Sequence, residues 1–195
     1  MTVLRASAVR PSPPARRIAF VAIGVAVAIA LAVGLCGVLF LRAGALAAPY
    51  TPRVEDGYLT APATLDDTDL PAIANLDAAL LGALRDAAAA ASSDGVSFEV
   101  TSGWRTARYQ QWLLEDAVED YGSVEVARQF VAAPDRSHHV TGHAVDIGPL
   151  DAQSWLIAHG AAWGLCQIYA NERWHFELAT DPGGTCPALR ENAAG

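Results

Sequence analysis

The chain has 195 residues and a mass of 20.4 kDa, which suits one ordinary domain and is too short for two large ones. Hydrophobic residues make up 52% and charged residues 17%, a composition that excludes a disordered polar chain. The net charge is −8 and lysine is absent, which excludes a general nucleic-acid binder, because such a protein presents a basic surface. Three cysteines are too few for a disulfide-rich scaffold.

The first predicted element is an apolar segment over residues 18–41 without a single charged side chain. About 20 apolar residues cross a bilayer core as a helix, so we expect one transmembrane helix here. Four arginines precede the segment and one closely follows it, which places residues 1–17 in the cytoplasm and the rest outside a single-pass cell membrane. A small-residue site near Ala47 leaves open the alternative of a cleaved signal and a secreted domain.

Residues 42–70, rich in Pro, Thr and Asp, are expected to form an extracytoplasmic linker before a domain over residues 71–195. The spacing of apolar residues in that domain predicts four helices and four strands. The helices are expected over 71–91, 107–118, 124–132 and 152–159, and the strands over 96–101, 142–147, 165–169 and 174–178. This irregular mixture predicts an α+β fold with a small central antiparallel sheet and flanking helices.

Two cysteines, Cys166 and Cys186, lie in the outer part of the chain. In an oxidising compartment they are expected to form one disulfide that ties the C-terminal tail to the sheet. Closing a loop of this length stabilises a fold by roughly 3 kcal/mol in the chain-entropy model. The alternative of two thiolate metal ligands lacks a neighbouring Cys-x-x-Cys pair.

Reactive side chains concentrate in three short segments, residues 102–110, 137–146 and 172–175. A catalytic zinc ion needs three protein ligands and one open position. The candidate ligands are His138, His139, His143, Asp146 and His175. Alternation along the strand predicted over 142–147 turns His143 away from Asp146 and makes it a poor ligand. The residues alone do not decide whether His138 and His143 are metal ligands.

Glu172 precedes His175 by three residues, on the turn before the last predicted strand. From there it can reach a water beside a metal without being a ligand, take the proton of that water and pass it to a leaving amine. The alternative is an ion pair with Arg173 or Arg136. Arg105 lies in the first of these segments, and one interpretation of it is an ion pair with one of the many carboxylates.

The spacing Ser-x-His-x-x-Gly-x-Ala-x-Asp, followed by Glu-x-Trp-His, resembles the zinc D-alanyl-D-alanine carboxypeptidases and dipeptidases of the VanY and VanX type. The matching positions are Ser137, His139, Gly142, Ala144, Asp146, Glu172, Trp174 and His175, with Ser102, Gly103, Arg105 and Gln110 upstream. The resemblance covers roughly residues 96–178, about half of the chain, and many fixed positions make it specific.

The resemblance implies a hedgehog-like α+β fold and a role for each matching residue. His139, Asp146 and His175 would bind one Zn²⁺ per chain. Glu172 would be the general base and acid, and Arg105 would steady the substrate carbonyl and its oxyanion. The residues expected to contact the peptide are Gln110, Ser137 and Trp174.

The expected activity is removal of the terminal D-alanine from peptidoglycan stem peptides or precursors, next to the membrane that anchors the enzyme. No nucleic acid and no protein partner are implied. One alternative is a peptidoglycan endopeptidase that uses the same zinc chemistry on another bond. A non-catalytic cell-wall-binding module is a further alternative, and Glu172 argues against it because a structural metal site needs no base.

Overall fold

The computed structural model describes residues 29–34 and 49–194. Residues 29–34 are helical and exposed, and no helix in these two ranges is both long and apolar enough to cross a bilayer. The remainder of the transmembrane helix predicted over 18–41, the N-terminal residues 1–17 and the cleavage site near Ala47 lie outside the described residues. The C-terminal compact unit, Tyr50–Gly195, carries all the predicted site residues.

A four-stranded antiparallel sheet forms the centre of this unit, with strand order β1-β2-β4-β3. The strands are β1 (Glu99–Ser102), β2 (Ala144–Gly148), β3 (Leu165–Gln167) and β4 (His175–Leu178). The helices are η1 (Val54–Asp56), α2 (Pro71–Ala74), α3 (Ala78–Ser93), α4 (Ala107–Tyr121), α5 (Val124–Ala127), α6 (Leu150–His159) and η2 (Gly160–Trp163). The predicted α+β fold with a small antiparallel sheet is confirmed.

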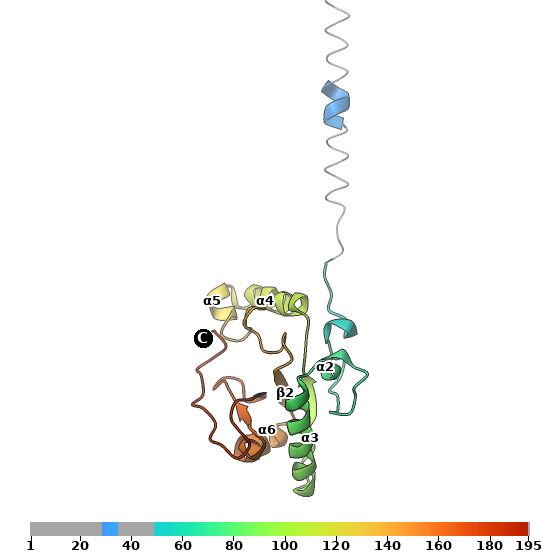
Figure 1. The fold of residues 1–195 in the computed structure, drawn as a ribbon. Coiled ribbons are helices and arrows are strands. Elements are labelled where there is room, and N and C mark those ends of the chain that lie inside the picture. The colour runs from blue at the N-terminus through green and yellow to red at the C-terminus, as the bar shows by residue number, and fades with distance from the viewer. Residues whose placement is uncertain (1–28, 35–48, 195) are drawn as a thin grey trace, which may run out of the picture. The chain divides into compact units, whose positions relative to one another are not determined.

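Helices α3 and α6 pack against one face of the sheet and against each other, and their apolar side chains form the main core with the strands. The fully buried members on the strands are Val100, Val145, Ile147, Leu165 and Phe176. Helices α4 and α5 form a separate small cluster, and Figure 1 shows them apart from α3 and α6.

The helix predicted over 71–91 is in fact two helices, α2 and α3. Asp77 interrupts it: its side chain accepts hydrogen bonds from the backbone of Ala79 and Leu80 and so begins a new helix. The helix predicted over 152–159 starts earlier, because α6 begins at Leu150. Its end continues as η2 to Trp163, and the following Gly164 has a positive φ.

The domain also begins earlier than the linker prediction allowed. Ala63 pairs with Val100 of β1 through two backbone hydrogen bonds of 2.9 and 2.7 Å, and Leu65 is buried in the main core. From Tyr50 onward the predicted linker 42–70 is therefore part of the folded unit. Its composition resembles a linker because only a few apolar side chains, Ala63 and Leu65 among them, carry the packing.

Candidate active site

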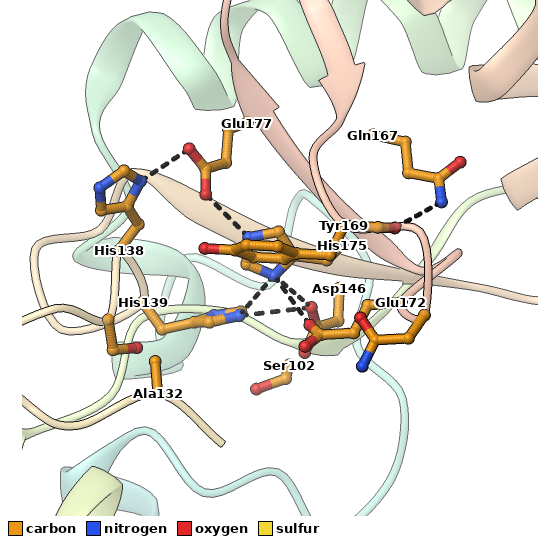
Figure 2. Close-up of polar contacts among 12 residues, drawn as sticks. Ser102, Ala132, His138, His139, Asp146, Gln167, Tyr169, Glu172, His175 and Glu177 are labelled. Carbon is orange, nitrogen blue, oxygen red and sulfur yellow. Dashed lines mark hydrogen bonds and ion pairs between the residues drawn. The ribbon is translucent and has the colours of Figure 1, made fainter. Parts of the chain in front are cut away.

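Three side chains from separate segments place one donor atom each at the corners of a nearly equilateral triangle. His139 Nε2 lies 3.2 Å from His175 Nδ1, and both atoms lie 3.3 Å from Asp146 Oδ1. Two ligands of a tetrahedral zinc ion, each about 2.0–2.1 Å from the metal, are about 3.3–3.4 Å apart. The triangle therefore has the size that one such ion requires (Figure 2).

The sheet brings two of these three residues together. Asp146 on β2 and His175 on β4 are direct cross-strand partners, so their side chains project from the same face. His139 comes from the turn before β2, and its backbone carbonyl accepts a 3.2 Å hydrogen bond from the Arg105 amide. That bond holds the turn against the loop after β1, which carries Arg105.

Both imidazoles are fixed by a hydrogen bond at the nitrogen that faces away from the triangle. His139 Nδ1 lies 2.8 Å from the carbonyl oxygen of Gly103, and His175 Nε2 lies 2.8 Å from Glu177 Oε1. Each acceptor requires a proton on that nitrogen, so the other nitrogen is left to bind a cation.

The charges in the triangle suit a cation. Burial and the positive charge of Arg105 lower the pKa of His139 to about 4. Burial alone would lower the pKa of His175, but its hydrogen bonds to Asp146 and Glu177 raise it to about 9. Burial opposes ionisation of Asp146, yet the two histidines hold the pKa of its carboxyl below the usual range. A cation that binds here would therefore compete with the proton of His175 and would be attracted by the charge of Asp146.

Glu172 lies beside the triangle, with its Oε2 3.7 Å from His175 Nδ1. Its Oε1 is buried and has no hydrogen-bond partner among the described residues. Burial raises the pKa of Glu172 to about 7, which suits a group that exchanges protons at neutral pH. Arg173 points elsewhere, donating a 3.3 Å hydrogen bond to Ser154, so the predicted alternative of a Glu172–Arg173 pair is absent between these residues.

Arg105 faces the same space from the loop between β1 and α4. Its Nη1 donates a 3.0 Å hydrogen bond to Ser102 Oγ, whereas its Nε is buried without a partner among residues 49–194. No carboxylate in the described part of the chain lies within ion-pair distance of it, which contradicts the ion-pair alternative. Burial lowers the pKa of this guanidinium, and the charge of Asp146 opposes that shift.

These groups line one cavity of about 190 Å³. Ser137 Oγ donates a 3.1 Å hydrogen bond to Gln110 Oε1, and the amide nitrogen of Gln110 donates a 2.7 Å bond to the carbonyl oxygen of Ala132. Trp174 lines the same cavity and is 43% exposed, so it lies at the rim. The structure therefore brings all the predicted ligand, catalytic and peptide-contacting residues to a single site.

The structure also decides the two histidines that the sequence left open: neither belongs to the donor triangle, and of the two only His138 lines the cavity. Gly142 has a φ of +78°, a conformation that favours glycine, so the chain turns there and β2 begins only at Ala144. His143 lies in that turn and is exposed, with its Nε2 3.9 Å from Asp77 Oδ2. The prediction that His143 turns away from the site is right, but the reason is the turn and not strand alternation.

Sequence reasoning gave no role to Glu177 or Tyr169, and both contact His175. Glu177 bonds His175 and also lies 2.6 Å from His138 Nδ1, and the Tyr169 ring centroid is 5.0 Å from that of His175. Side chains alternate along a strand, so the strand predicted over 174–178 puts Glu177 on the face of His175, and a sequence signal for Glu177 existed. Tyr169 follows β3, and no local pattern indicated it.

The predicted disulfide between Cys166 and Cys186 is present. Beyond it the tail runs beside β3, where the amide of Arg190 donates a 2.9 Å hydrogen bond to the carbonyl of Ile168. The tail reaches the cavity, which Ala193 also lines. The disulfide thus attaches the tail to the sheet, as expected.

Comparison with known proteins places these observations in a family. The family model for VanY, described as a D-alanyl-D-alanine carboxypeptidase, matches residues 74–180, which is more than half of the chain. The chain belongs to the VanY family. The matched segment contains every residue of the triangle together with Glu172 and Arg105.

One curated relative agrees with this assignment. A D-alanyl-D-alanine carboxypeptidase of Enterococcus faecalis is 29% identical over 138 residues, which cover 56% of this chain and 52% of the relative. The chain therefore spans about half the length of that curated relative.

Two solved structures share the fold. One is a glutamate-to-alanine mutant of the vancomycin resistance D,D-pentapeptidase VanY from a VanB-type cassette, in complex with Zn(II). It is 27% identical with a TM-score of 0.51, over 62% of this chain and 79% of that one. The other is VanYB in complex with D-alanine-D-alanine, 26% identical with a TM-score of 0.51, over 62% of this chain and 77% of that one.

Proposed function

We propose that this VanY-family chain is a zinc-dependent carboxypeptidase that removes the terminal D-alanine from peptidoglycan stem peptides or their precursors. One observation carries the proposal: the donor triangle, Glu172 and Arg105 all face one small cavity. A structural metal site requires only ligands, whereas an adjacent carboxylate and guanidinium with buried unpaired atoms fit hydrolysis. The relatives that hold Zn(II) and D-alanine-D-alanine support the choice of metal and substrate.

The donor set fits zinc. Two imidazole nitrogens and one carboxylate oxygen are zinc ligands, and three protein ligands leave the fourth position open. His139, Asp146 and His175 would hold the ion. Zinc bound there would supply Lewis acidity and lower the pKa of a water molecule from about 16 towards about 7.

Glu172 would act as the base and then as the acid. It would accept a proton from the water whose oxygen adds to the carbonyl carbon of the last peptide bond. It would then deliver that proton to the leaving amino nitrogen as the C–N bond breaks. The products are free D-alanine and a stem peptide shorter by one residue.

Arg105 would stabilise the negative charge that develops on the carbonyl oxygen. Its Nε is buried without a partner among the described residues, and Ser102 holds Nη1 in place, so the guanidinium is oriented before substrate arrives. Donors of this kind contribute about 2.7–4 kcal/mol to transition-state stabilisation.

The cavity suits a small terminal residue. Its volume of about 190 Å³ is small, and its polar wall contains Gln110 and Ser137. Each of these side chains already makes a hydrogen bond within the protein and retains capacity for another, which would be available to the peptide end. Trp174 at the rim is positioned to contact the peptide.

We also propose that the domain is extracytoplasmic and held at the membrane by residues 18–41. The uncharged apolar segment, the arginines before it and the disulfide support this location, because disulfides persist in oxidising compartments.

The test is to incubate the purified, zinc-loaded chain with a stem pentapeptide that ends in D-Ala-D-Ala and to follow the products by mass spectrometry. We expect loss of one alanine, abolished by a chelator and restored by zinc. A matched peptide ending in D-Ala-L-Ala and the Glu172→Gln variant are the controls, and neither should react. A cut inside the stem would identify an endopeptidase, and an intact peptide beside stoichiometric zinc would contradict the proposal.

A further inference from the structure

A chain of three side chains leads from the metal triangle to the protein surface. Glu177 lies between two imidazoles: its Oε1 is 2.8 Å from His175 Nε2 and its Oε2 is 2.6 Å from His138 Nδ1. Glu177 and His175 are nearly fully buried, whereas the His138 side chain is 47% exposed. Figure 2 shows Glu177 on the side of the His175 ring that faces away from Asp146 and His139.

The two histidines of the triangle are supported in different ways. His139 donates to the backbone carbonyl of Gly103, an acceptor that the main chain holds in place. His175 donates to a carboxylate on a flexible side chain, which could rotate about its own bonds. The orientation of the His175 ring therefore depends on whatever holds Glu177.

His138 provides that second anchor. With Oε1 occupied by His175, rotation of the Glu177 carboxylate would break the contact between Oε2 and His138 Nδ1. A carboxylate this buried has few positions in which both oxygens are satisfied, and leaving one unpaired is unfavourable. His138 and His175 are 37 residues apart in sequence, so only the fold creates this connection.

We infer that Glu177 is a positioning residue for the metal centre and that His138 acts on the metal through Glu177. Glu177 selects the His175 tautomer that carries its proton on Nε2 and presents Nδ1 to the ion, and His138 fixes the direction of the carboxylate. Carboxylates that orient a metal-binding histidine typically change metal affinity by roughly 10–100-fold. The inference rests on the proposed zinc centre and adds two residues that are not part of the donor triangle, of which His138 also lines the cavity.

The inference predicts an ordered series of zinc affinities. Glu177→Ala should weaken zinc binding by roughly 10–100-fold, and Glu177→Gln should recover part of this loss because its amide oxygen still accepts from His175. His138→Ala should weaken binding by a smaller factor, about threefold to tenfold on the same scale. The control is His143→Ala, which removes a comparable exposed histidine near the site and should leave zinc affinity unchanged.

A double-mutant cycle tests whether His138 acts through Glu177. In the Glu177→Ala background, the further change His138→Ala should have no additional effect on zinc affinity. If the two substitutions acted independently, their fold-changes in zinc affinity would instead multiply. The measurement is competition between the full chain and a chromophoric chelator for zinc, with thermal unfolding of each metal-free variant to verify that it folds.

The His175 tautomer provides a readout that a general loss of packing would not change. Long-range ¹H–¹⁵N spectra of the zinc-loaded chain should show the His175 proton on Nε2, and Glu177→Ala should shift or broaden that signal while His139 keeps its own. Wild-type protein that fails to bind zinc would overturn the proposed function itself. Wild-type protein that binds zinc, with His138→Ala equal to His143→Ala, would overturn only this inference.

Discussion

Strands β2 and β4 present two faces that are almost equally buried and chemically opposite. One face carries Val145 and Phe176, both fully buried in the main core. The other carries Asp146, His175 and Glu177, which are 9%, 4% and 7% exposed. The apolar face stabilises the fold by removing surface from water, whereas the polar face is tolerated because each charge has a partner. The extent of burial therefore does not show which face carries out the chemistry. The two faces differ because the buried side chains of the polar face are charged and each has a partner.

The largest effect is expected from a substitution within the donor triangle on the polar face. Asp146→Ala removes the only carboxylate of the triangle, so zinc and turnover should be lost together. The check is metal content after dialysis against low zinc, measured beside alanine release from the pentapeptide. Turnover that persists in a zinc-free Asp146→Ala protein would contradict the assignment of the triangle.

Removing the base should separate turnover from metal binding. Glu172→Gln keeps the shape of the cavity wall but cannot accept the proton, so turnover should fall by about 10²–10⁴-fold. Zinc content should stay at one ion per chain. A variant that loses zinc as well would show that Glu172 is a ligand and not the base.

Damage to the apolar face should appear as lost stability. Phe176→Ala leaves a cavity in the main core and should lower the free energy of unfolding by about 3–5 kcal/mol, measured by urea denaturation. Leu178→Ala lies two residues along the same strand on the same face, but Leu178 is 38% exposed. It serves as the matched control and should have a clearly smaller effect.

The smallest predicted effect is a pH dependence in the metal-free protein. Burial raises the pKa of Glu172 from 4.5 to about 7. The folded state thus binds this proton more tightly than the unfolded state. The resulting contribution to the free energy of unfolding is present below pH 4.5 and is lost as the pH rises to about 7. Over this window wild type should lose on the order of 3 kcal/mol relative to Glu172→Gln. Parallel denaturation curves at pH 4.5 and 7.5, with chelator present, measure the difference.

The sequence by itself determined most of the residues that the site uses. The motif spacing named the candidate ligands, and the family resemblance implied His139, Asp146 and His175 as ligands and Glu172 as the base, whereas His138 and His143 stayed open and Tyr169 and Glu177 were given no role. Such local patterns are reliable because side chains alternate along a strand whatever its neighbours are. The same alternation failed for His143, because a glycine with positive φ delays the start of β2.

Only the tertiary structure decided how these residues meet. The register that pairs Asp146 with His175 joins segments 29 residues apart, and the contact between His138 and Glu177 joins segments 39 residues apart. The packing of Ala63 against β1 depends on the fold in the same way. Local sequence sets which way a side chain points from its own strand or turn. Which strand lies opposite, and in what register, depends on burial of the whole core, and no short segment contains that information.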